Sequence, residues 1–152
     1  MIYILYLFLI IFTKLSKILQ TTPKIEKNMD IESILNSEIV DLSSLKSFFA
    51  SDKDALIQII QVYITDTEPR GKTLEENINN IDYPTIKSVA HFLKSSFGLM
   101  GIKCATEIAE LEKMAERKEP AEEINKSLSF IVPIIKESIE EYKGILAKLE
   151  QL

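Results

Sequence analysis

Residues 84–101 read PTIKSVAHFLKSSFGLMG, and their apolar positions have the spacing of an amphipathic helix. Asp82 is a plausible N-cap, Pro84 fits the first turn, and Gly101 stands where a left-handed residue would end the helix. The apolar side chains form one stripe: Ile86, Val89, Ala90, Leu93, Phe97 and Met100. We therefore predict a helix from Pro84 to Met100 that buries this stripe.

His91 is the only histidine of the chain and lies away from the apolar stripe. At about 100° per residue it stands roughly 150° from the centre of the stripe, so its imidazole should point to solvent. The residues one or two turns away share this face and are small or cationic: Lys87, Ser88, Lys94, Ser95 and Gly98. A lone imidazole cannot assemble a multi-histidine metal site. Three interpretations remain open, namely a nucleophile, a base, or a residue without a chemical role.

The pattern His91-x-Leu93-Lys94-x-Ser96, with Gly101 ten residues after the histidine, resembles the signature of histidine-containing phosphotransfer (Hpt) domains. In that family the histidine accepts a phosphoryl group from an aspartyl phosphate on a response-regulator receiver domain and passes it to another receiver. The resemblance implies that His91 is the phosphoryl acceptor. It also implies receiver domains, or a hybrid sensor kinase, as partners. Ser95 departs from the family pattern, since this position is often glycine, and its hydroxyl could alter hydrogen bonding around the ring.

The resemblance also gives roles to the neighbours of His91. Neutral imidazole is a nucleophile near neutral pH, and Lys94 would compensate the charge of the phosphoryl oxygens, with Lys87 as a weaker second candidate. The small residues of this face would leave room for the partner: Ser88, Ser95 and Gly98. Phe92 and Leu99 lie at the edge of the face, either as core between helices or as an apolar docking rim, and we favour core.

The composition of the 152 residues fits a single domain and argues against several kinds of site. A net charge of −5 without a basic stripe disfavours nucleic-acid binding. A single cysteine, Cys104, excludes an intramolecular disulfide and fits a reducing, cytoplasmic compartment. The sequence has no glycine-rich phosphate loop and no second Cys or His for a zinc site. We expect a phosphocarrier rather than an enzyme, with no cofactor of its own; by the resemblance, Mg²⁺ would be held by the receiver.

A long helix is predicted before the histidine-bearing one. Ser51 or Asp52 can cap it, and Ile60 and Leu74 stand two heptads apart although Pro69 lies between them. A shared register across a proline favours one helix that bends there over a free loop. The same register continues at two later positions, Ile78 and Ile81.

The rest of the chain is also helical in pattern, and no stretch alternates like a strand. We predict one helix with Cys104, Ile108, Leu111 and Ala115 on its apolar side, and a last helix over about 121–149. The fold class is therefore all-α: an up-down-up-down four-helix bundle with a short N-terminal helix or helices packed across it. The histidine-bearing helix and the one after Gly101 should form an antiparallel hairpin.

Residues 1–28 differ from the bundle domain expected at 29–152. Residues 1–12 are all apolar or aromatic and are followed by Lys14 and Lys17. This run is shorter than the about 20 residues that cross a membrane, and it lacks the basic start and cleavage site of a secretory signal. It could be a membrane-associated anchor, an apolar extension packed on the domain, or upstream sequence wrongly included in the reading frame. We favour the last, with the domain starting at Met29; any membrane contact would involve only residues 1–12.

Two other functions remain open. A helical adaptor could bind receiver or other signalling domains through the His91 face without phosphotransfer. An enzyme could use His91 as a general base, but it would need a concave pocket beside the imidazole. Bundle geometry predicts a convex, open face instead.

Overall fold

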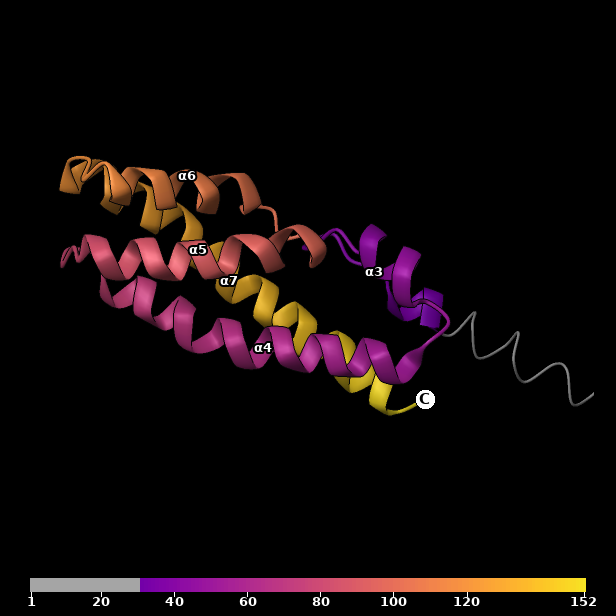
Figure 1. The fold of residues 1–152 in the computed structure, drawn as a ribbon. Helices are drawn as coiled ribbons and strands as arrows, with labels where there is room; N and C mark the ends of the chain where they lie inside the picture. Colours follow the sequence, from indigo (N-terminus) through magenta and orange to yellow (C-terminus); the bar gives the residue numbers. More distant parts are fainter. Residues whose placement is uncertain (1–30) are drawn as a thin grey trace, which may run out of the picture.

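The computed structural model describes residues 31–152, which form an all-helical bundle without a strand in that range (Figure 1). Residues 31–34 are helical and are followed by α3 (Ser43–Phe49), α4 (Lys53–Glu76), α5 (Tyr83–Leu99), α6 (Ala105–Glu116) and α7 (Ala121–Glu150). The last four helices run alternately in opposite directions, and α3 lies at one end of them. The predicted all-α bundle is confirmed. The expectations for residues 1–28 fall outside the described residues.

Two helix pairs build the bundle. Helices α5 and α6 form the antiparallel hairpin that the sequence predicts, and α4 packs along α7. Their apolar sides meet in one core that includes Leu56, Phe97, Leu111 and Tyr142, all of them fully buried. Within residues 31–152, no helix is both long and apolar enough to cross a membrane.

Helix α5 has the boundaries that its sequence predicts, to within one residue at each end. The Asp82 carboxylate accepts hydrogen bonds from the backbone N–H of Thr85, at 3.4 Å, and from the Thr85 hydroxyl, at 2.8 Å, which caps the helix. Of the predicted stripe, Val89 is half-buried and the other five side chains are buried. Gly101 has φ +61°, the left-handed conformation expected after the last turn. This cap and stripe fix which residues of α5 face solvent.

Helix α4 is continuous through Pro69 and begins after Asp52, whose side chain accepts from the N–H of Ala55. It ends at Glu76, so Ile78 and Ile81 lie in the following turn and the expected continuation of the helical register through them is wrong. The reason is Asn77, whose side chain donates to the carbonyl of Thr73 and accepts from the N–H of Asp82. These bonds stabilise a turn in place of another helical turn.

Two helices leave an apolar side chain partly or largely exposed. In α7, Leu146 is half-buried, while its neighbour Ile145 is buried. In α3 the side chain of Leu45 is buried, but Phe48 is 70% exposed. A seven-residue helix across the end of a bundle has room to bury one narrow side only.

Candidate functional site

His91 projects from α5 into solvent, and its side chain is 68% exposed. Ala90 and Leu93, the residues of the apolar stripe nearest to His91 in the sequence, are fully buried. The helix is therefore held with the histidine face outward. The spacing of the sequence predicted this orientation. An exposed imidazole on a helix flank is open to a reacting group carried by another protein.

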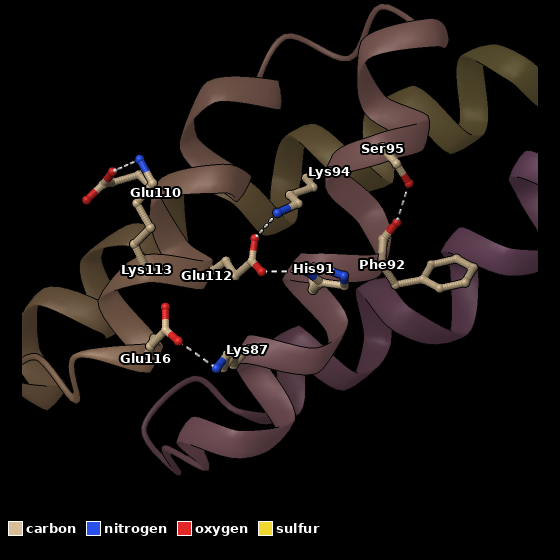
Figure 2. A network of polar contacts seen from close by, with 9 residues as sticks. All are labelled: Lys87, His91, Phe92, Lys94, Ser95, Glu110, Glu112, Lys113 and Glu116. Carbon is tan, nitrogen blue, oxygen red and sulfur yellow. Dashed lines mark hydrogen bonds and ion pairs between the residues drawn. The ribbon is translucent and has the colours of Figure 1, made fainter.

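The imidazole is held by a carboxylate from the neighbouring helix (Figure 2). The Nδ1 atom of His91 lies 2.5 Å from Oε1 of Glu112 in α6, and Nζ of Lys94 lies 2.6 Å from Oε2 of the same carboxylate. The Glu112 side chain is only 14% exposed. Hydrogen bonds from Lys94 first and from His91 second lower the pKa of Glu112 below its ordinary value of 4.5. Glu112 is therefore a carboxylate at neutral pH, and it accepts the hydrogen bond from both partners.

This contact sets the tautomer of a neutral His91. A carboxylate can only accept, so Nδ1 must carry the proton. In neutral imidazole the other nitrogen, Nε2, then holds the free lone pair. The geometry thus presents a nucleophilic nitrogen on the exposed side of the ring.

A second ion pair joins the same two helices. Nζ of Lys87 lies 2.8 Å from Oε1 of Glu116, and this hydrogen bond raises the pKa of Lys87. The two contacts, Lys87 with Glu116 and His91 with Glu112, step four residues along each helix in opposite directions, as an antiparallel hairpin requires. Both lysines singled out from the sequence are therefore engaged by glutamates of α6.

Sequence reasoning did not find Glu112 or Glu116. Both are on α6, outside the motif, where glutamates on a polar helix face are common. A signal was present in the four-residue spacing of Glu112 and Glu116, which matches that of Lys87 and His91. Pairing them would have required the register of the hairpin, and that register is set by how the apolar sides of α5 and α6 pack.

The small residues of the His91 face leave it open. Ser88, Ser95 and Gly98 are all exposed. The Ser95 hydroxyl donates to the carbonyl of Phe92 in its own helix, at 3.1 Å, so it is turned away from the imidazole. A Cβ added at Gly98 would meet no atom within 4 Å. Serine at the departing position 95 therefore leaves access to the ring unobstructed.

A protein-family model described as the Hpt domain matches residues 58–151. The chain belongs to the Hpt domain family. The match covers the whole of α5, α6 and α7, together with most of α4, and so includes His91 and Glu112. No curated protein matches this chain, and neither does any solved structure. Family membership confirms the resemblance suspected from the sequence. Hpt domains are helical bundles that act as phosphocarriers in phosphorelays.

One residue of this Hpt domain does not lie where we expected. Phe92 was placed in the core, but its ring is 43% exposed. It follows His91 directly and so falls outside the buried stripe. The guanidinium carbon of Arg70, in α4, lies 3.5 Å from the ring centroid, a cation–π contact that covers part of the ring. We also favoured a core position for Leu99, which is half-buried and packs against the core.

In the part of the chain that the structure describes, residues 31–152, no group of three or more His, Cys, Asp or Glu side chains is placed to hold a metal ion. Cys104 is buried, and desolvation raises the pKa of its thiol to about 12. A thiol in that state is protonated at neutral pH and packs as core. The polar contacts of the candidate site join His91, Lys94 and Glu112.

Proposed function

We propose that this Hpt domain carries a phosphoryl group on Nε2 of His91. It takes the group from the aspartyl phosphate of a receiver domain and gives it to a second receiver. The observation that carries the proposal is the exposed imidazole whose Nδ1 is bound to Glu112, at 2.5 Å, which leaves Nε2 as the free nucleophile. Mg²⁺ is assigned to the receiver, as the family resemblance implies.

The proposed phosphoryl transfer forms one bond and breaks one bond, and it needs only the imidazole and the aspartyl phosphate of the receiver. The Nε2 lone pair attacks phosphorus, a nitrogen–phosphorus bond forms, and the bond from phosphorus to the aspartyl oxygen breaks and leaves a carboxylate on the receiver. The ring gains a positive charge, because Nδ1 keeps its proton. Glu112 accepts that N–H and lies next to the new charge, so it favours the phosphorylated ring. Transfer to the second receiver is the reverse reaction.

The two lysines have unequal roles in this proposal. Lys94 shares the Glu112 carboxylate with His91, so its ammonium is held beside the reacting group, where it can compensate charge on the phosphoryl oxygens. Lys87 lies one turn further and is bound to Glu116. We therefore assign phosphoryl contact to Lys94, and Glu112 is a positioning residue that acts through the imidazole.

Replacing Glu112 with glutamine should slow phosphorylation of His91 about tenfold, the rate equivalent of one charge-assisted hydrogen bond. Glutamine lacks the charge that fixes the Nδ1 proton and compensates the ring. The matched control is Glu110→Gln, on the same helix, because Glu110 is bound to Arg117 and Lys113 instead. The measurement is the rate of label transfer from a phosphorylated receiver. Equal rates for the two variants would remove Glu112 from the mechanism.

The lowered pKa of Glu112 also predicts a pH dependence of stability. A carboxyl whose pKa is lower in the folded state stabilises the fold above its unfolded pKa, here 4.5, and loses that effect as the pH falls through the folded value. The stability difference between wild type and Glu112→Gln, from urea unfolding, should persist at about pH 5 and shrink as the pH falls below 4.5. A difference that already vanishes at about pH 6 would contradict a carboxylate held by Lys94 and His91.

The proposed function is tested with receiver domains from the same organism, each purified and phosphorylated with a radioactive label. Incubation should transfer an acid-labile, alkali-stable label to the Hpt domain, and an unphosphorylated second receiver should then remove it. Binding of a receiver without any transfer would instead identify an adaptor. No label from any receiver would overturn the carrier function.

A further inference from the structure

A phosphoryl group on Nε2 of His91 would lie on the opposite edge of the ring from the contacts with α6. Nδ1 faces α6, because it is bound to Glu112. Figure 2 shows Nε2 pointing away from Glu112, toward the side on which Phe92 projects. Phe92 in turn contacts Arg70 of α4. The outer oxygens of the phosphoryl group would therefore face α4.

The charged groups on the α6 side of the ring already neutralise one another. Nζ of Lys87 lies 2.8 Å from Glu116, and Nζ of Lys94 lies 2.6 Å from Glu112, so each lysine is paired with one glutamate. A phosphoryl group carries about two negative charges near neutral pH. The phosphorylated ring, with its Nδ1 proton, compensates one of them. A cation on the Nε2 side would compensate the other.

Arg70 in α4 lies level with the turn of α5 that carries His91. Its Cζ atom is 3.5 Å from the centroid of the Phe92 ring, and Phe92 directly follows His91. Further along the same two helices, the ring centroids of Tyr63 and Phe97 are 6.4 Å apart. Both contacts fit one antiparallel register of α4 against α5. This register places the Arg70 side chain opposite the histidine turn.

The Arg70 guanidinium is held in position with donors to spare. Its Nη1 donates to the backbone carbonyl of Asp66 at 2.6 Å, while the Asp66 carboxylate is more distant, at 4.0 Å. Its face rests on the Phe92 ring as a cation–π contact, and the side chain is 32% exposed. A guanidinium has five N–H donors in a planar fork that fits two phosphoryl oxygens at once. Nη1 makes the hydrogen bond to Asp66, and the other nitrogens can donate to a phosphoryl group.

We propose that Arg70 is a second phosphoryl-binding residue, whose guanidinium donates hydrogen bonds to the oxygens of the group on Nε2 of His91. This inference rests on the proposed function. Lys94 compensates charge from the α6 edge of the ring, and Arg70 does so from the α4 edge. Phe92 is a positioning residue, because its ring holds the guanidinium at that edge. The contact exists only in the phosphorylated protein, so it stabilises that form relative to the free form.

The first test measures how the label divides at equilibrium between the Hpt domain and a receiver. Arg70→Gln should lower the ratio of labelled Hpt domain to labelled receiver about tenfold, the equivalent of one charge-assisted hydrogen bond. Arg70→Lys keeps the charge without the fork, and its ratio should fall between those of wild type and Arg70→Gln. An equilibrium ratio compares the free proteins. A residue that only bound the receiver would change the rates and leave this ratio unchanged.

Arg117→Gln is the matched control for the first test. Arg117 is the only other arginine in the chain, and its guanidinium is bound to Glu110 and Glu119. This variant should leave the ratio at the wild-type value. An unchanged ratio for Arg70→Gln, or an equal fall for Arg117→Gln, would overturn the role of Arg70.

A second test needs no receiver. Phosphoramidate phosphorylates an exposed imidazole: a bond forms from Nε2 to phosphorus, the nitrogen–phosphorus bond of the reagent breaks, and its nitrogen leaves as ammonia. Nuclear magnetic resonance of the ¹⁵N-labelled protein should show the Nε–H signal of Arg70 shifting on phosphorylation and that of Arg117 unchanged. The two glutamine variants assign these signals. An Arg70 signal that stays in place on the phosphorylated protein would overturn this inference alone. If phosphoramidate does not label the wild type, His91 is no phosphoryl acceptor and the carrier function itself fails.

Discussion

His91→Gln should abolish phosphorylation of this Hpt domain, both by receivers and by phosphoramidate. The glutamine side chain has an amide in place of the imidazole, and an amide nitrogen has no free lone pair with which to attack phosphorus. No other histidine exists in the chain to replace it. The expected result is a loss of acid-labile label to the background of the assay, measured on gels of the wild type and the variant side by side.

This loss should be chemical and not structural. The His91 side chain is 68% exposed, and substitutions at exposed positions usually change the free energy of unfolding by less than about 0.5 kcal/mol. Urea unfolding of His91→Gln should therefore nearly superimpose on that of wild type. Acid-labile label on the variant at the wild-type level would assign the phosphoryl group to another residue. That result would end the assignment of His91.

Gly101→Ala should destabilise the bundle strongly, by roughly 3 kcal/mol or more, since a left-handed non-glycine residue alone costs about 1 kcal/mol or more. Gly101 has φ +61°, and a Cβ there would lie 1.9 Å from the backbone oxygen of Asp41. That backbone cannot move away freely, because the Asp41 N–H donates to the Gly101 carbonyl at 2.9 Å. The measurement is urea unfolding followed by circular dichroism.

Gly98→Ala, in the last turn of α5, is the matched control. Its Cβ would meet nothing within 4 Å, and alanine is favoured over glycine inside a helix by about 0.5–1 kcal/mol. This variant should therefore be more stable than wild type, and Gly101→Ala much less stable. Similar unfolding midpoints for the two variants would contradict the left-handed turn between α5 and α6.

The fold was predictable because its signals are local. The cap at Asp82, the stripe from Ile86 to Met100 and the glycine at 101 each specify helix ends or a buried side from neighbours along the chain. The outward position of His91 follows from the same periodicity. The family signature lies on this one helix as well, so sequence alone led to the correct family.

The features that the sequence did not reveal depend on contacts between helices. Glu112 reaches His91 only through the register of α5 against α6. Phe92 was expected in the core, and its exposure under Arg70 depends on how α4 crosses beside α5. The end of α4 before Ile78 depends on side-chain bonds of Asn77 that compete with helix continuation. None of these contacts leaves a periodic pattern in the sequence.

The most direct test is to identify the nitrogen that carries the phosphoryl group. Nuclear magnetic resonance of the ¹⁵N-labelled Hpt domain, phosphorylated by a receiver, would detect coupling between phosphorus and one imidazole nitrogen of His91. The contact between Nδ1 and Glu112 predicts that the coupled nitrogen is Nε2, with Nδ1 still protonated. Coupling to Nδ1, or a phosphorylated protein with no phosphohistidine, would contradict the account.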